Sequence, residues 1–176
     1  MASLTEFKQQ LEGGARPNLY RVTVNFPTII TNNDVTEKLH FMCKAAQVPG
    51  VRAGTVEAWF MGRSIKLAGD REFDDFTITI LNDVDWKIRT QFERWMNIMN
   101  NHAENVGLTS PNDYMADVQV EQLDRGGKTI ATYNLVHAFP TDVAAIDLSY
   151  ETINTIEEFA VTLTYAYWQR SDVGIV

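Results

Sequence analysis

The sequence has 176 residues, of which 45% are hydrophobic and 11% aromatic, and it carries 15 Lys and Arg against 23 Asp and Glu. This length suits one domain with a sizeable core, and the hydrophobic content excludes an intrinsically disordered chain. The net charge of −8 disfavours tight nucleic-acid binding, which depends on cations that meet phosphates.

Targeting and redox signals are weak. The first residues lack a basic start followed by an apolar run, and no apolar segment reaches the roughly 18 residues of a membrane span, so we expect neither a secretory signal nor a transmembrane segment. The single cysteine, Cys43, cannot form an intrachain disulfide. This suits assembly in a reducing cytoplasm.

The first predicted element is a short helix. Leu4, Phe7 and Leu11 recur at helical spacing, and Gly13-Gly14 would end the helix. A helix of about 10 residues is marginal in water, so it needs a surface to lie on. That surface belongs either to its own domain or to a neighbouring subunit.

Strands dominate the next part of the chain. Alternating apolar and polar residues predict strands over residues 18–26, 39–45, 55–60, 64–67 and from Phe76 through Ile80. Turns are expected at residues 32–34, 61–63 and 68–71, with a break at Pro49-Gly50. Trp59 and Phe60 lie near a hairpin tip, where large apolar groups either dock into a partner or fold back on their own core.

A longer helix is predicted over residues 86–101. Its apolar stripe consists of Ile88, Phe92, Trp95, Met96 and Met99. Asp83 and Asp85 precede it, at the position where carboxylates cap free N–H groups and suit the helix dipole.

The C-terminal part is again strand-rich. After a loop at residues 107–113, strands are expected over residues 114–123, 129–138, 144–150 and 158–168, with a turn at residues 124–127, a break at Pro140 and a loose tail at residues 171–176. One face of the last strand carries Phe159, Val161, Leu163, Tyr165 and Tyr167. The opposite face is small and Thr-rich, and it either packs against another layer or lines an aqueous surface.

These elements predict an α+β fold that is mainly antiparallel β: a β-sandwich or half-barrel of about eight strands, with one packed amphipathic helix and a short N-terminal helix. We expect residues 1–176 to form a single domain, with an N-terminal arm at residues 1–16, a protruding hairpin at residues 51–71 and the tail at residues 171–176.

Charge is distributed unevenly along this chain. Residues 38–71 contain six basic side chains against two acidic ones, whereas residues 113–158 contain nine acidic against two basic. Either solvated faces simply differ, or a basic region of one subunit meets an acidic region of the next.

The sequence contains no clear catalytic or metal-binding motif. His40, which the prediction places in a strand, His102 and His137 lack metal-ligand spacing, and Cys43 lacks an activating partner. The neighbouring carboxylates Asp74-Asp75 and Glu157-Glu158 point to opposite faces of a strand, so they do not converge on a substrate. Gly126-Gly127 before a lysine is typical of a hairpin turn rather than a phosphate loop. We therefore expect no catalytic, cofactor or metal site, and no enzyme.

Residues 60–76 read F-M-x-R-x-I-x-x-A-G-D-R-x-F-D-D-F. This pattern resembles the tail tube proteins of contractile-tailed bacteriophages. The resemblance continues through residues 15–19, 43–45, Phe92 with Trp95, Pro140-Thr141 and the last strand up to Tyr167-Trp168. The connection at residues 32–38 is longer than usual in that family, and residues 171–176 extend beyond it.

The resemblance implies a structural subunit of a virion, assembled in the host cytoplasm. Six subunits would form a ring whose inner strands join into one β-barrel, and rings would stack into a tube inside a contractile sheath. Its partners would be further copies of itself, the sheath, the baseplate and the tail terminator, with DNA only as passing cargo.

Two sets of residues are candidates for these roles. For subunit contacts we expect Leu4, Phe7, Leu11, Trp59, Phe60, Met61, Arg63, Asp70 and Arg71. For the lining of the bore, where acidic groups would repel phosphates, we expect Asp117, Glu121, Asp147 and Glu151.

Two alternatives remain open at this point. One is the inner tube of a phage-derived or type VI injection system, which shares the fold by resemblance. The other is a monomeric β-sandwich that binds a ligand in a concave pocket.

Overall fold

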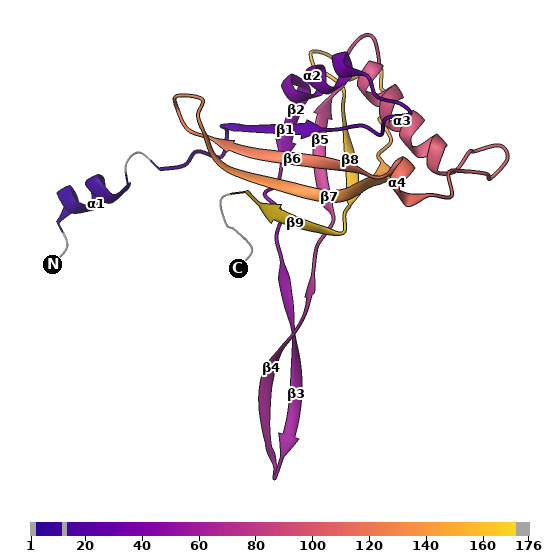
Figure 1. Ribbon diagram of the computed structural model, residues 1–176. Helices are drawn as coiled ribbons and strands as arrows, with labels where there is room; N and C mark the ends of the chain where they lie inside the picture. Colours follow the sequence, from indigo (N-terminus) through magenta and orange to yellow (C-terminus); the bar gives the residue numbers. More distant parts are fainter. Residues whose placement is uncertain (1–2, 12–13, 172–176) are drawn as a thin grey trace.

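The computed structural model describes residues 3–11 and 14–171. Within these residues the chain forms a mainly antiparallel seven-stranded sheet, a two-stranded hairpin and four helices (Figure 1), which confirms the predicted α+β class. The strands are β1 (Tyr20–Val24), β2 (Cys43–Ala46), β3 (Arg52–Phe60), β4 (Arg63–Glu72), β5 (Phe76–Leu81), β6 (Ala116–Leu123), β7 (Thr129–Val143), β8 (Glu158–Thr164) and β9 (Tyr167–Arg170). The helices are α1 (Leu4–Leu11), α2 (Asn33–Met42), α3 (Lys87–Met99) and α4 (Pro111–Tyr114).

Strand β7 joins two halves of the large sheet. The strand order is β1-β6-β7-β8-β5-β2, and β9 also pairs with β7. In Figure 1, β1, β6 and β7 run horizontally, while β5 and β8 run vertically. The two halves therefore fold over each other and enclose the core between them, as in the predicted half-barrel.

The bend in β7 lies at a β-bulge. His137 has a φ of 57°, and the pairing with β6 slips between Val118–Leu135 and Ala116–Ala138. The backbone N–H of His137 donates to the Asp117 carboxylate at 3.2 Å, which helps to hold this conformation. The predicted break at Pro140 is wrong, because Pro140 lies within β7 opposite Leu163.

The core is formed by both half-sheets and two helices. Of the predicted stripe on α3, Ile88, Phe92 and Trp95 are fully buried, whereas Met96 and Met99 are only partly buried. Gln91 is buried on the same helix, and the Trp95 indole donates to the Tyr114 carbonyl at 2.6 Å. The remaining buried apolar residues are Val22, Val24, Phe26, Val35, Leu39, Phe76, Ile78, Ile80, Val118, Val120, Leu135, Ala138, Phe159, Val161, Leu163 and Tyr165.

Helix α2 replaces a predicted turn and strand. The sequence suggested a turn at residues 32–34 and a strand over residues 39–45, whereas the helix runs to Met42 and only Cys43–Ala46 is extended. Val35 and Leu39, four residues apart, form the buried face of the helix. Their burial against β1 and α3 outweighs the turn preference of the asparagines.

Asp83 and Asp85 do not cap α3 as predicted. The helix begins after Trp86, which has a φ of 54°, and no side chain caps it. Instead the nearly buried Asp83 carboxylate pairs with Lys38 of α2, and Asp85 lies 3.7 Å from the same ammonium group. The hydrogen bond from Lys38 to Asp83 raises the pKa of the lysine. These carboxylates thus link α2 to the loop before α3.

The final predicted strand is divided in two. Strand β8 ends at Thr164, and the chain turns at Tyr165 and Ala166 before β9 pairs with another part of β7. The turn lies opposite the bulge at His137. Phe139 pairs with Thr164 at the end of β8, and Val136 pairs with Tyr167 at the start of β9, so the bulge and the turn face each other between these two pairs.

The chain departs from the predicted elements between β7 and β8. The predicted strand at residues 144–150 is wrong, because residues 144–157 form an irregular loop. Apart from Ser171, the predicted tail at residues 171–176 lies outside the described residues.

Candidate assembly surfaces

The β3–β4 hairpin projects from the body of the protein (Figure 1). Its turn is formed by Met61 and Gly62, with φ values of 47° and 80°, which is the left-handed pair expected of a tight two-residue hairpin turn. The predicted turn at residues 68–71 is wrong, because these residues continue β4 opposite β3. The hairpin therefore extends from Arg52 to Glu72 without interruption by a second turn.

Cross-strand pairing gives the hairpin one apolar face. Paired residues share a side of the ribbon, and alternate residues along each strand share a side as well. The apolar hairpin face consists of Val56, Ala58, Phe60, Arg63, Ile65 and Leu67. The other face carries Thr55, Glu57, Trp59, Ser64, Lys66 and Ala68.

No part of the chain that the structure describes covers this hairpin. Every residue of β3 is exposed, including Trp59 at 70% and Phe60 at 69%, and Met61 at the turn is exposed as well. A two-stranded ribbon alone is marginally stable in water, and contiguous exposed apolar side chains mark interaction sites. The hairpin tip (residues 59–63) thus brings four of the predicted contact residues together at one end of the molecule.

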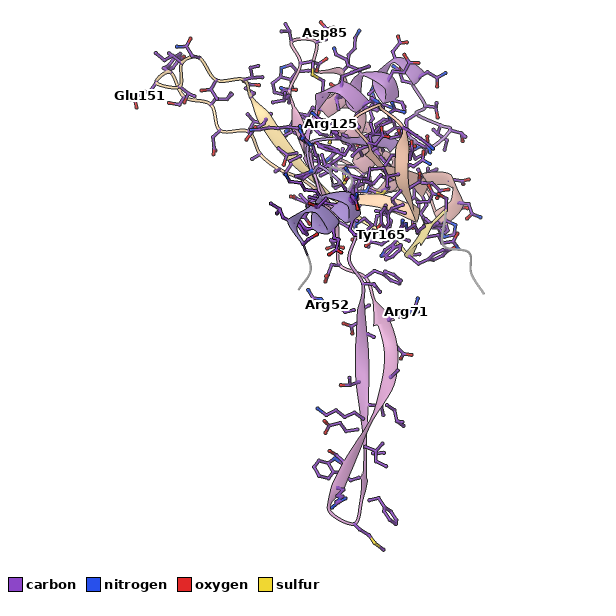
Figure 2. All side chains as sticks on the ribbon, turned by 90° about the vertical axis from the view of Figure 1, so that its left-hand side faces the viewer. Arg52, Arg71, Asp85, Arg125, Glu151 and Tyr165 are labelled. Atoms are coloured by element: carbon purple, nitrogen blue, oxygen red, sulfur yellow. The ribbon has the colours of Figure 1, made fainter. Side chains whose placement is uncertain are left out.

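The root of the hairpin is tied to the body. Arg52 lies 3.1 Å from the Asp74 carboxylate, and the indole of Trp168 on β9 donates to the Gly50 carbonyl at 2.9 Å. Figure 2 shows Arg52 and Arg71 at this root, with Tyr165 just above them. The predicted contact residues Asp70 and Arg71 therefore lie near the root, away from the tip.

Asp74 and Asp75 contribute to this root. As a neighbouring pair in the sequence, they were considered only for catalysis, and that role was rejected. The hydroxyl of Thr164 donates to Asp75 at 2.6 Å. Burial, followed by the charges of Asp74 and Asp75, raises the pKa of Tyr165. Sequence reasoning missed their structural role, and that of Trp168, because it depends on where β9 lies.

A close approach of two glycines lies next to the root. A Cβ on Gly69 would lie 2.9 Å from the backbone carbon of Gly54 on the opposite strand. The pairing slips between Ala53 and Thr55 at this level. Only glycine fits here without a shift of the backbone.

Helix α1 is the second exposed apolar element. Ser3 and Glu6 cap its start reciprocally, with the Glu6 N–H 3.2 Å from the serine hydroxyl and the Ser3 N–H 2.7 Å from the glutamate carboxylate. Leu4, Phe7 and Leu11 are all exposed, and the helix stands apart from the sheet in Figure 1. The predicted stripe is present, but no surface among the described residues of the chain covers it.

The predicted bore residues fall into two separate pairs. Asp117 and Glu121 lie on the outward face of β6, where Glu121 is 3.5 Å from Arg21 on β1. Asp147 and Glu151 are exposed on residues 144–157, and Figure 2 shows Glu151 at the end of a projecting loop. Within one chain the structure does not bring the two pairs together.

The segment at residues 144–157, the acidic loop, also borders an open hollow. The hollow has a volume of about 610 Å³. Its walls include Ile146, Leu148, Tyr150 and Ile156, of which the last three are strongly exposed. The sequence pattern at residues 144–150 suggested a strand, so this surface was not predicted.

The described residues offer little for metal or thiol chemistry. Within residues 3–11 and 14–171 no group of three or more His, Cys, Asp and Glu could hold a metal ion. His40 lies in α2 rather than in the predicted strand. Burial raises the pKa of the Cys43 thiol to about 11, so the reactive thiolate scarcely forms near neutral pH. In the described parts of the chain, every helix is too short or too polar to cross a bilayer.

Comparison with known sequences gives consistent matches. A family model described as phage tail tube protein matches residues 15–171. The tail tube protein gp19 of Enterobacteria phage T4 is 31% identical over 156 residues, which cover 88% of this chain and 91% of that protein.

Solved structures show a similar fold. A chain from the baseplate of the anti-feeding prophage has a TM-score of 0.66 at 17% identity, over 89% of this chain and 94% of that one. A chain from the extended sheath–tube complex of an extracellular contractile injection system, PVC, has a TM-score of 0.63 at 16% identity, over 98% of this chain and 100% of that one.

Proposed function

This chain belongs to the phage tail tube protein family, and from that premise we propose that it is the subunit of the inner tube of a contractile phage tail. The family is structural, which agrees with the prediction that the chain is not an enzyme, and it places the protein in the tail of the virion. In this proposal six copies form a ring, and rings stack into a hollow tube through which DNA is ejected.

The observation that carries the proposal is the uncovered apolar hairpin face. A β-ribbon that exposes Phe60, Ile65 and Leu67 on one side is stabilised when a second copy covers that side. Helix α1 presents the same requirement through its own stripe. We assign both, together with Asp70 and Arg71 near the root, to contacts with neighbouring subunits.

Ring closure would use the edges of the large sheet. Strands β1 and β2 end the strand order, so each presents unpaired backbone groups on one side. Such edges are aggregation hazards in a monomer, and a closed ring of paired strands removes them. This agrees with a single tail-tube domain whose edge strands pair with those of its neighbours.

The four carboxylates singled out in the sequence are proposed to line the bore. Asp117 and Glu121 would act from the face of β6, and Asp147 and Glu151 from the acidic loop. Negative charge offers DNA no counterion-release gain, so the cargo slides rather than binds. A reconstruction of the tube with all four side chains on its outer wall would overturn this assignment.

Further partners are proposed from the solved neighbours. These come from a baseplate and from a sheath–tube complex, and a further neighbour comes from a sheath/tube terminator. We infer that this chain likewise contacts a sheath, a baseplate and a tail terminator. The baseplate neighbour was symmetrised sixfold, which supports six copies per ring.

The tube of a phage-derived injection particle is the second candidate. The fold neighbours from injection systems favour it, whereas the 31% identity to a phage tail tube protein favours the phage tail. Cargo decides between them: purified particles that contain DNA-filled capsids support the tail, and capsid-free particles support the injection system.

Electron microscopy of the purified, concentrated protein tests assembly directly. Hollow rings or straight tubes are expected, either spontaneously or after seeding with a baseplate. The variant Phe60→Asp should remain unassembled, while the control Val84→Asp, at an almost fully exposed position away from the hairpin, should assemble like the wild type. Unassembled wild-type protein after seeding would contradict the proposal and favour a monomeric ligand-binding module.

A further inference from the structure

We propose that the hairpin tip of one copy docks into the hollow of the acidic loop of a second copy. This inference rests on the proposed function and deepens it, because it names the acceptor for the hairpin.

The donor and the acceptor lie at opposite ends of the molecule. In Figure 2 the hairpin extends downward from the body, and the loop that carries Glu151 projects at the upper end. A contact between two different surfaces of identical subunits is heterologous, so it can repeat from copy to copy without closing. Donor and acceptor at opposite ends therefore suit head-to-tail growth along the axis of a tube.

Charge favours this pairing. Residues 56–67 of the hairpin contain Arg63 and Lys66 against Glu57, which leaves a net charge of +1. The acidic loop contains Asp147, Glu151 and Glu157 and no basic residue, which leaves −3. Opposite charges at a contact set its register and speed association.

The charged side chains that would meet are not engaged in ion pairs within the described part of the chain. Arg63, Asp147 and Glu151 form no ion pair within the part of the chain that the structure describes. By contrast, Lys66 lies 3.7 Å from Glu57 on the same hairpin, and Glu157 accepts from the Asn82 amide at 3.0 Å. We assign Arg63 to one of these two carboxylates, Asp147 or Glu151. A single guanidinium neutralises at most one of the three negative charges of the loop, so the loop stays net negative toward the bore.

The apolar surfaces match as well. Phe60 and Met61 protrude from the tip, and the hollow presents Leu148, Tyr150 and Ile156, which stay exposed among residues 3–11 and 14–171. A volume of about 610 Å³ lies within the roughly 300–1,000 Å³ of cavities that enclose ligand-sized groups. The hollow is therefore large enough for the two side chains of the tip.

Helix α1 of a second copy is a weaker candidate for the same hollow. Its described charges, Glu6 and Lys8, cancel, so it offers no complement to the acidic loop. The experiment below includes it as a competing occupant.

Disulfide crosslinking tests the contact. All variants carry Cys43→Ser, so that only introduced thiols react. A chain with Phe60→Cys and Leu148→Cys should form a ladder of disulfide-linked multimers, with loss of the monomer band, and reductant should reverse it. A ladder rather than a dimer is expected because the contact repeats head to tail.

Two matched controls keep the test specific. In the first, Leu148→Cys is combined with Phe7→Cys, which places a thiol on the exposed stripe of α1. In the second, Phe60→Cys is combined with Val106→Cys, on an exposed loop elsewhere. Neither should form the ladder, and a ladder from the first control would assign the hollow to α1 instead. Unchanged circular dichroism confirms that each variant is folded.

The outcomes separate this inference from tube formation itself. Tubes with the ladder support both, and tubes without the ladder overturn the docking while the tube function stands. A ladder in concentrated protein that never forms tubes supports the docking and contradicts the tube. Absence of both, after seeding, overturns both.

Discussion

Strand β8 and the β3–β4 hairpin have the same alternation of apolar and polar residues but opposite surroundings. Phe159 on β8 is 2% exposed, whereas Phe60 on β3 is 69% exposed. Around β8, helix α3 and the opposite half-sheet supply the cover, whereas nothing in the described part of the chain covers the hairpin. The alternation therefore predicts the strand in both places, but only the arrangement of the whole assembly decides what covers it.

Two tryptophans provide the sharpest contrast between these regions. Trp95→Ala should lower the free energy of unfolding by about 3–5 kcal/mol, because it leaves a cavity and removes the bond to the Tyr114 carbonyl. Trp59→Ala should change it by no more than about 0.5 kcal/mol in dilute monomer, because this side chain is exposed.

Urea denaturation of both variants below the concentration of assembly measures this difference. In tube yield the order of the two variants should reverse: Trp59→Ala should lose more assembly relative to its small loss of stability, because it weakens the tip contact. A loss of monomer stability in Trp59→Ala comparable to that in Trp95→Ala would mean that the hairpin folds back onto the body in solution.

The glycine contact at the hairpin root should be the next most sensitive position. Gly69→Ala forces a Cβ to within 2.9 Å of the Gly54 backbone, and overpacking of this kind costs about 1–3 kcal/mol. Hydrogen exchange should accelerate across residues 52–72 and remain unchanged in β8. Gly50→Ala, which has open space around its Cβ, is the control, and equal acceleration in both variants would contradict the steric explanation.

Charge reversal at the hairpin tip should have a smaller effect per subunit. Arg63→Glu replaces an attraction with a repulsion at an exposed contact, where single pairs contribute roughly 0.2–1 kcal/mol. We expect a severalfold rise in the critical concentration of assembly, measured by sedimentation. Glu151→Arg in the same chain should restore part of the loss, and no restoration by either Glu151→Arg or Asp147→Arg would separate Arg63 from the acidic loop.

The last expected effect appears only at alkaline pH and concerns the body of the protein rather than the hairpin. Burial raises the pKa of Cys43 to about 11, above its ordinary value of 9.0, so the unfolded chain loses this proton first as the pH rises. The stability contributed by the neutral thiol is complete below pH 9 and declines as the pH approaches 11.

Unfolding in urea at pH 8 and pH 10 tests this assignment. Wild type should lose more stability between these values than Cys43→Ser, which does not titrate there. The neighbouring Tyr20, whose pKa burial also raises, should leave a residual decline in both proteins. Equal slopes would mean that the thiol is already solvated in the folded state.

The parts of the fold that sequence reasoning recovered are those with strong local patterns. The stripe of Phe92 and Trp95 on α3, the alternation in β5 and β8, and the apolar hairpin tip all depend on residues within one element. By contrast, α2 buries only Val35 and Leu39, which is too few for a clear helical signal after an asparagine-rich start.

The remaining errors share a cause in the path of the chain. The bend at His137 and the division between β8 and β9 occur where strands of different half-sheets meet, and no local composition marks them. The candidate surfaces follow the same rule. Met61 and Arg63 could be grouped from the sequence because they are close neighbours along the chain. The placement of Asp117 and Glu151 on different surfaces could not be read before the fold was known.

The root of the hairpin has a mechanical consequence. With nine residues at about 3.3 Å each, β3 forms a lever of about 30 Å whose pivot is held by the Arg52–Asp74 and Trp168–Gly50 contacts. A tilt of only about 5° at the pivot would displace the end of such a lever by roughly 2–3 Å, the scale of one strand residue. The curvature that a column of these subunits tolerates before it fractures would then depend on the stiffness of that pivot.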